Sequence, residues 1–150
     1  MKPENARVLL VDDDSDALLH FSELLSPAGY QIDCATDYKT AQSLLEKNSY
    51  AVAILDMVMP GVDGVLNENA GVELTNFIRT KHPITRVMIL TNMNSIQRAT
   101  EMTQQQVAYL SKSETDPERL RAAVRAQVEE AEHAYKQLRK MLYPPSNWDA

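Results

Sequence analysis

Five short apolar runs alternate along the chain with stretches of helical period. Between the runs, apolar residues recur at spacings of three and four, which is the period of an amphipathic helix. Repeated alternation of strand and helix predicts a parallel sheet with helices on both of its faces. The sequence therefore predicts an α/β fold, a doubly wound, five-stranded parallel sheet with five helices. The predicted strands are residues 7–11, 31–35, 51–55, 86–90 and 107–110.

Residue types mark several of the expected helix ends. Gly29 should end the first helix, since glycine readily adopts the left-handed conformation that follows a helix. The last helix is predicted from Pro117 to Leu142, with Asp116 as its N-cap, and Pro144 and Pro145 should stop it. At about 1.5 Å per residue this helix would reach ~40 Å, more than the sheet needs. We therefore expect one domain over residues 1–125, followed by a helical extension and short tail over residues 126–150.

The extension carries an apolar seam with alternating spacings of four and three. Such a heptad pattern is typical of a coiled coil or of contact between two helices. Three readings stay open: a homodimer formed through this helix, a linker into a further module, or a solvated linker of which only the first turns pack. The seam consists of Val124, Val128, Ala131, Tyr135, Leu138 and Leu142.

Composition narrows the class of protein. Hydrophobic residues make up 44% of the chain and charged residues 24%, which is ordinary for a globular domain. No apolar run approaches the ~20 residues that span a bilayer, and the N-terminus lacks a signal-peptide pattern, so we expect no membrane association. The single cysteine, Cys34, excludes an internal disulfide and favours a cytoplasmic location. A net charge of -6 argues against direct nucleic-acid binding.

Polar side chains follow four of the predicted strands. Because the carboxyl ends of parallel strands meet at one edge, where such sheets bind ligands, these side chains should share a pocket. Unpaired buried charge is costly, so an acidic pocket there requires a cation. The residues are Asp12, Asp13 and Asp14 after the first strand, Asp56 after the third, Thr91 after the fourth and Lys112 after the fifth.

This set of residues suits phosphoryl transfer. Mg²⁺ prefers oxygen ligands and would bind Asp13 and Asp56. Asp56 would attack phosphorus, while the metal and Lys112 neutralise charge on the phosphoryl oxygens. Without a cation, two carboxylates about 4 Å apart would repel by roughly 4 kcal/mol at an effective dielectric of 20. Asp14 is expected mainly to cap the following helix.

The order and spacing of four motifs resemble the receiver domain of two-component response regulators. The motifs are VDDD (11–14), LDMVMPGVDG (55–64), ILT (89–91) and YLSK (109–112). The resemblance covers residues 7–125 and implies a flavodoxin-like receiver fold. It also implies a signalling domain, not an enzyme, which accepts a phosphoryl group from a histidine kinase or histidine phosphotransfer protein. Self-catalysed hydrolysis would then release phosphate.

The resemblance assigns a role to each site residue. Phosphorylation would change the face formed by the fourth helix, fifth strand and fifth helix, to which a partner would respond. The implied roles are Asp56 as phosphoacceptor, Asp12 and Asp13 as the acidic pair around Mg²⁺, Val58 as a carbonyl ligand, Thr91 as the switch hydroxyl, Tyr109 as the aromatic that changes rotamer and Lys112 as the phosphate-binding lysine.

The chain departs from the receiver pattern at four places. Ser113 stands where proline usually follows the lysine, and Asn92 stands where a small residue usually follows the switch hydroxyl. The bulk of Asn92 is expected to narrow the approach to Asp56. About seven extra residues, near 65–71, precede the third helix, and the last helix is longer than a bare receiver requires.

Two alternatives accompany this reading. A pseudo-receiver would keep the fold and signal without phosphorylation. A haloacid-dehalogenase-like phosphatase would use Asp12 as nucleophile and Asp14 as acid/base. That class needs a further acidic pair on a later strand, and no apolar strand follows Lys112.

Overall fold

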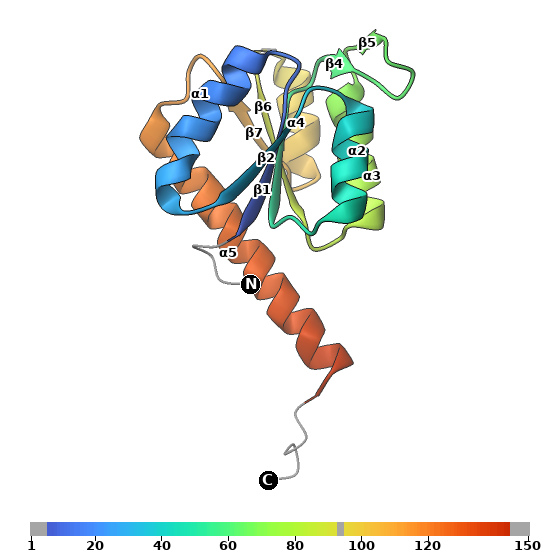
Figure 1. Cartoon of the computed structure of the whole chain (residues 1–150), viewed down its shortest axis with the longest axis vertical. Helices are drawn as coiled ribbons and strands as arrows, with labels where there is room; N and C mark the ends of the chain where they lie inside the picture. Colours follow the sequence, from blue (N-terminus) through green and yellow to red (C-terminus); the bar gives the residue numbers. More distant parts are fainter. Residues whose placement is uncertain (1–5, 93–94, 145–150) are drawn as a thin grey trace.

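The computed structural model describes residues 6–92 and 95–144, in which five strands form one parallel sheet (Figure 1). The strand order is β2-β1-β3-β6-β7. All five predicted strands are confirmed, each within one residue of its predicted ends. Their bounds are β1 Arg7–Val11, β2 Gln31–Ala35, β3 Val52–Leu55, β6 Arg86–Thr91 and β7 Ala108–Ser111.

Helices cover both faces of the sheet, as predicted. Helices α1 and α5 pack on one face, and α2, α3 and α4 pack on the other (Figure 1). A short 3-10 helix, η2, extends α1 by three residues. The bounds are α1 Ser15–Leu25, η2 Ser26–Ala28, α2 Tyr38–Lys47, α3 Ala70–Lys81, α4 Ile96–Gln104 and α5 Pro117–Leu142.

Each strand supplies side chains to two separate apolar layers. In β1, Leu9 and Val11 belong to the layer under α2 and α3, while Val8 and Leu10 belong to the layer under α1 and α5. This alternation follows from the two-residue period of an extended strand. Central strands covered on both sides need apolar residues throughout, so β3 reads as an unbroken apolar run.

The predicted helix caps are present. The Asp14 carboxylate accepts hydrogen bonds from the backbone N–H groups of Asp16 and Ala17. The carboxylate of Asp116, the residue before Pro117, accepts a hydrogen bond from the backbone N–H of Arg119 at 2.8 Å. Gly29 follows η2 with φ 90°, the left-handed region that favours glycine.

The connection after β3 that carries the extra residues contains a short hairpin, which the sequence patterns did not predict. Strand β4, Met59–Pro60, pairs antiparallel with β5, Leu66–Asn67. The Gly61 N–H donates to the Val65 oxygen at 3.0 Å, and Gly64 turns the chain with φ 79°. Helix α3 already begins at Ala70, so the last two residues of the predicted insertion are helical.

Helix α5 runs well beyond the sheet (Figure 1). The first half of its seam, Val124, Val128 and Ala131, is fully buried against this domain. The second half is open: Tyr135 and Leu138 are 38% and 37% exposed. Leu142 is the last helical residue, as predicted, and residues 145–150 of the predicted tail lie outside the described residues.

A polar network joins residues of β1, β2 and the loop that precedes β3. The Tyr50 hydroxyl donates to Asp33 Oδ2 at 2.6 Å, although Tyr50 is only 2% exposed. The Arg7 guanidinium donates to Asn48 Oδ1 and to Gln31 Oε1. These contacts join β1, β2 and the loop before β3. No helix among residues 6–92 and 95–144 has the length and apolar character needed to cross a membrane.

Candidate functional site

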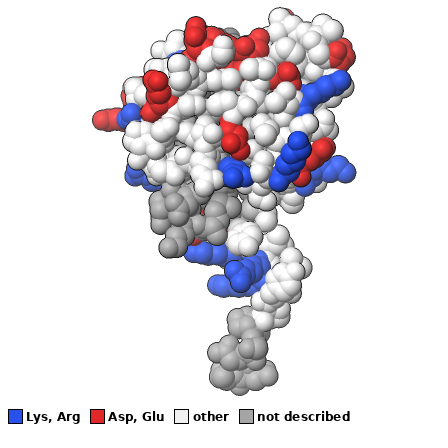
Figure 2. All heavy atoms as spheres, viewed as in Figure 1, with Lys and Arg blue, Asp and Glu red and all other residues white. Residues whose placement is uncertain are grey.

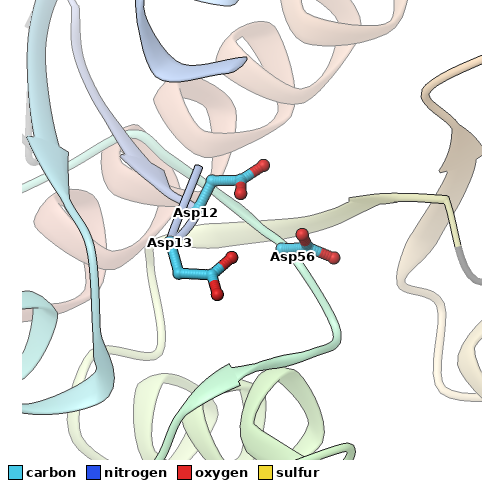
Figure 3. A group of neighbouring side chains, drawn as sticks. All are labelled: Asp12, Asp13 and Asp56. Carbon is cyan, nitrogen blue, oxygen red and sulfur yellow. The ribbon is translucent and has the colours of Figure 1, made fainter. Parts of the chain in front are cut away.

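The ends of four strands bring the predicted site residues together at the carboxyl edge of the sheet. Asp12, Asp56 and Thr91 are almost fully buried there, while Asp13 is exposed. Figure 3 shows Asp12 and Asp13 leaving the end of β1 and Asp56 standing just beyond β3, with all three carboxylates projecting to the same side. The parallel register places these ends side by side, because Val11 pairs with Leu55 and Leu55 pairs with Ile89.

The Asp56 carboxylate is fixed by three donors. Its Oδ1 atom accepts a hydrogen bond from the Met57 backbone N–H at 2.7 Å and another from the Thr91 hydroxyl at 2.6 Å. Its Oδ2 atom accepts one from the Lys112 ammonium at 2.8 Å. The resemblance implied that Thr91 moves towards a phosphoryl group. Here the hydroxyl already contacts the carboxylate.

Lys112 lies between two buried acids. Its ammonium forms ion pairs with both Asp12 and Asp56. Burial disfavours the ammonium, but hydrogen bonds to Asp12 and Asp56 outweigh that effect and raise the pKa of Lys112. Burial raises the pKa of the Asp12 carboxyl, while its hydrogen bond to Lys112 acts in the opposite direction. Lys112 therefore supplies positive charge to both carboxylates.

The acidic residues also form a group that fits a divalent cation. One carboxylate oxygen from each of Asp12, Asp13 and Asp56 lies within 4.8 Å of the others. Oxygen donors of this kind are what Mg²⁺ prefers. Three carboxylates against the single ammonium of Lys112 leave net negative charge for such an ion to balance. Val58, half-buried, follows Asp56 by two residues.

Tyr109 lies on β7, three residues before Lys112. The ring is half-buried, and burial raises the pKa of its phenol. It lines a groove of about 530 Å³ between α4 and α5. The groove therefore begins at the strand that precedes Lys112. Other residues in its wall are Ile96, Ala99, Leu110, Thr115 and Arg119.

Ser113 and Asn92, the unusual residues near the site, follow the ends of β7 and β6. The Lys112 backbone N–H donates to the backbone carbonyl oxygen of Thr91 at 3.0 Å, and the Ser111 and Ser113 hydroxyls lie 3.2 Å apart. Every peptide bond of the described residues is trans. Asn92 is exposed, and its predicted effect on the approach to Asp56 stays a prediction.

Gly71 is a site residue that the sequence patterns did not single out. Its N–H donates to the Met57 oxygen at 3.0 Å, so the first turn of α3 lies directly against the segment that carries Asp56. Gly64, which belongs to the receiver-like motif, lies instead at the hairpin turn, with nothing near its missing Cβ. A glycine at the start of a predicted helix was the available signal for close packing.

The chain resembles known proteins across most of its length. Residues 8–125 match the profile of the response regulator receiver domain. The alginate biosynthesis transcriptional regulatory protein AlgB of Pseudomonas aeruginosa is 31% identical over 127 residues, which cover 84% of this chain and 26% of AlgB. Response regulator protein FleR of the same species is 32% identical over 108 residues, covering 71% of this chain and 21% of FleR. The chain thus spans about a quarter of the length of these relatives.

Solved structures agree with this assignment. The signal receiver domain of an HD domain-containing protein from Pseudomonas fluorescens Pf-5 superposes with a TM-score of 0.76 at 25% identity, covering 91% of this chain and 96% of that chain. A CheY-like response regulator receiver domain protein from Methanospirillum hungatei JF-1 gives 0.73 at 21% identity, covering 87% and 98%, and supports the fold alone.

These matches do not favour either alternative. A haloacid-dehalogenase-like phosphatase would need a later acidic strand, and no strand follows β7 in the part of the chain that the structure describes. The matched residues 8–125 include all the strands of the sheet except the first residue of β1. The chain belongs to the response regulator receiver domain family and is a signalling module of two-component phosphorelay systems.

Proposed function

We propose that Asp56 accepts a phosphoryl group from a phosphohistidine of a kinase or phosphotransfer protein. The observation that carries this proposal is the buried Asp56 carboxylate, held at once by Met57, Thr91 and Lys112. An Asp56 oxygen bonds to phosphorus as the bond between phosphorus and the donor imidazole nitrogen breaks. The electron pair of that bond stays on the imidazole.

Mg²⁺ is the cofactor that we propose for this step, held by Asp12, Asp13, Asp56 and the Val58 carbonyl. When bound, it neutralises charge on the transferring phosphoryl oxygens. The residues of the chain contribute separately. Asp12, through its ion pair, orients the Lys112 ammonium towards Asp56. Lys112 and Thr91 can then bond the phosphoryl oxygens, which add about -1.5 to -2 of charge at neutral pH.

We propose that phosphate is then released at the same site. Water attacks phosphorus, the bond between phosphorus and the Asp56 oxygen breaks, and the carboxylate is regenerated. On this proposal the lifetime of the phosphoryl group on Asp56 sets the duration of the signal, and no separate substrate is converted. We propose a cytoplasmic location for this domain, since a chain with a single cysteine forms no internal disulfide.

The proposed output is the groove between α4 and α5. Thr91 ends β6 and Tyr109 lies on the adjacent strand, paired with Ile89. New bonds from Thr91 and Lys112 to a phosphoryl group would draw the two strand-end loops inward and alter the wall of the groove around Tyr109. A partner that binds this face would report the phosphorylated state, without nucleic-acid contact by the domain itself.

Acetyl phosphate provides a direct test of the site. The protein is incubated with Mg²⁺ and acetyl phosphate, or with a phosphorylated histidine kinase, and its intact mass is measured. We expect one phosphoryl adduct that Asp56→Asn abolishes and Asp12→Asn retains. An adduct on Asp12 would contradict the proposal, and no adduct with any donor would favour the pseudo-receiver.

We also propose that the exposed end of α5 pairs two copies of the chain. The seam that Val128 and Ala131 bury within the domain continues without a break into exposed Tyr135, Leu138 and Leu142. An apolar helical face that leaves its own domain gains stability only from a further surface. On this proposal residues 1–125 form the receiver domain and residues 126–150 the extension.

Sedimentation equilibrium tests the pairing. We expect the full chain to dimerise and the double variant Leu138→Asp/Leu142→Asp to be monomeric. Gln137→Asp, an exposed change beside the seam, is the matched control and should stay dimeric. Monomeric mass for the unaltered chain would end the dimer proposal and leave a linker as the role of this helix.

A further inference from the structure

We propose that the hairpin of β4 and β5, residues 59–67, is a docking element for the protein that donates the phosphoryl group. Its exposed apolar tip packs against an apolar patch on that donor. The inference rests on the proposed phosphorylation of Asp56. It adds a specificity determinant, two of whose three tip residues, Val65 and Leu66, belong to the extra residues by which this chain departs from the receiver pattern.

The apolar tip consists of Val62, Val65 and Leu66. These side chains are 53%, 63% and 62% exposed, although they stand on one short hairpin. Their neighbours Asp63 and Asn67 are polar. An apolar patch with a polar surround is typical of a surface that another protein covers.

The hairpin presents this tip in a fixed orientation. The Gly61 N–H donates to the Val65 oxygen, which closes the turn. At the base, the Asn67 side chain accepts from the Asn69 N–H at 2.7 Å and donates to Glu73 Oε2 at 3.3 Å. A surface that is already ordered loses little conformational freedom when a partner binds.

The hairpin also begins close to the phosphoacceptor along the chain. Strand β4 begins at Met59, three residues after Asp56. Acetyl phosphate is small enough to reach Asp56 without touching the tip. A folded protein that places a phosphohistidine at Asp56 must instead lie against the surface around this residue, and we infer that the hairpin is part of that surface.

Charge indicates which kind of protein fits. Acidic side chains gather at the end of the molecule where α1 begins and where β4 and β5 lie (Figures 1 and 2). A donor with basic residues around a small apolar patch complements this surface and is attracted to it. A second copy of the chain would instead bring two acidic rims together, so we assign the surface to the donor. The exposed acids are Asp13, Asp14, Asp16, Asp63 and Glu68.

The test compares a protein donor with a small donor. Histidine kinases are autophosphorylated with ATP, and the one that labels the unaltered chain fastest serves as the protein donor. For Val65→Asp/Leu66→Asp we expect the initial rate from this kinase to fall about tenfold or more, since like charge and lost apolar contact both oppose docking. The rate from acetyl phosphate should stay within about twofold, because that donor makes no contact with the tip.

A matched variant controls for added charge. Met141→Asp changes an apolar residue that is 78% exposed on the far end of α5. It should leave both rates unchanged. Equal kinase rates for the hairpin variant and the unaltered chain would overturn the proposal. Loss of labelling from both donors would also overturn it, because the tip would then act on the geometry of Asp56.

Two further outcomes separate this inference from the proposed function. If acetyl phosphate labels Asp56 but no kinase labels the unaltered chain, the docking element is overturned while the site chemistry stands. If neither donor labels Asp56, the proposed function fails first. Sedimentation gives a further check. If the unaltered chain is a dimer and the hairpin variant is a monomer, the tip contacts a second copy of the chain and the donor proposal is overturned.

Discussion

A Cβ atom on Gly71 would lie only 2.5 Å from the backbone oxygen of Asp56. It would also lie 2.8 Å from the Cα atom of Met57. Because both of these are backbone atoms, no side-chain movement could relieve the contact. Only glycine lets the first turn of α3 approach the segment that carries the phosphoacceptor.

Gly71→Ala should therefore affect stability and chemistry together. We expect the free energy of unfolding to fall by about 1–3 kcal/mol, as for other overpacked positions. The rate of Asp56 labelling by acetyl phosphate should also fall, because the backbone of Asp56 must shift. Urea unfolding and intact-mass kinetics measure the two effects.

Gly64→Ala is the control for that variant. Gly64 has φ 79° and no atom within 4 Å of the missing Cβ. Alanine there should cost about 1–2 kcal/mol of backbone strain and leave the labelling rate unchanged. Equal labelling rates for the two glycine variants would contradict the role of Gly71.

Removal of the Lys112 charge should make the protein dependent on a metal ion. Lys112→Met would leave Asp12 and Asp56 without their shared buried partner, at a cost of about 3–5 kcal/mol. Mg²⁺ should restore part of that stability, since it supplies positive charge to the same carboxylates. Thermal unfolding with and without Mg²⁺ should show a larger metal-induced rise in Tm for the variant than for the unaltered chain.

The matched change is Lys136→Met on α5. Its ammonium lies 3.2 Å from Glu132, and the lysine side chain is 65% exposed. An exposed pair of this kind contributes only about 0.2–1 kcal/mol. Similar losses of stability for the two lysine variants would indicate that Lys112 is a surface charge and not the buried cation of the site.

The contact between Thr91 and Asp56 gives a third prediction. Thr91→Val keeps the shape of the side chain but removes the hydroxyl that donates to Oδ1 at 2.6 Å. We expect a loss of about 1–3 kcal/mol, because the buried carboxylate loses a donor. Thr91→Ser keeps the hydroxyl and should retain most of the stability in urea unfolding. A serine variant as unstable as the valine variant would assign the effect to packing.

Local signals predicted most of the site. Asp12, Asp56 and Thr91 each follow an apolar strand, and the strand pattern alone brings them to one edge. Asp14 and Asp116 were recognisable as caps because they precede helical periods. Each of these features is signalled by residues close to it in the sequence, so it could be predicted from the sequence.

Three features could not be predicted from the sequence, each for a different physical reason. The two-residue strands β4 and β5 are too short to show a period, so the sequence patterns gave no sign of the hairpin. The ion pair from Lys112 to Asp12, in addition to Asp56, depends on the spacing of β1, β3 and β7. The heptad pattern did not distinguish Val128, which is buried in its own domain, from Tyr135, which is exposed. A helix face that packs on its own sheet and one that packs on another helix have the same apolar period.

Tyr50 should control stability at alkaline pH. Burial, and then the hydrogen bond to Asp33, raise the pKa of this phenol well above its ordinary value of 10.0. The phenol of the unfolded chain ionises near its ordinary pKa, whereas the folded protein keeps the proton. The stabilisation is therefore complete below about pH 10 and is lost above it, by up to ~1.4 kcal/mol per pH unit.

Tyr50→Phe separates this titration from that of other groups. The variant loses the hydrogen bond to Asp33, which should cost about 1 kcal/mol at neutral pH. Burial also raises the pKa values of Tyr30, Tyr38 and Tyr109, but these groups titrate in both proteins. Urea unfolding from about pH 8 to pH 11 should show a steeper decline for the unaltered chain than for Tyr50→Phe, so that the two stabilities converge. Parallel curves would mean that the Tyr50 phenol ionises equally easily in the folded and unfolded chain, against the contact with Asp33.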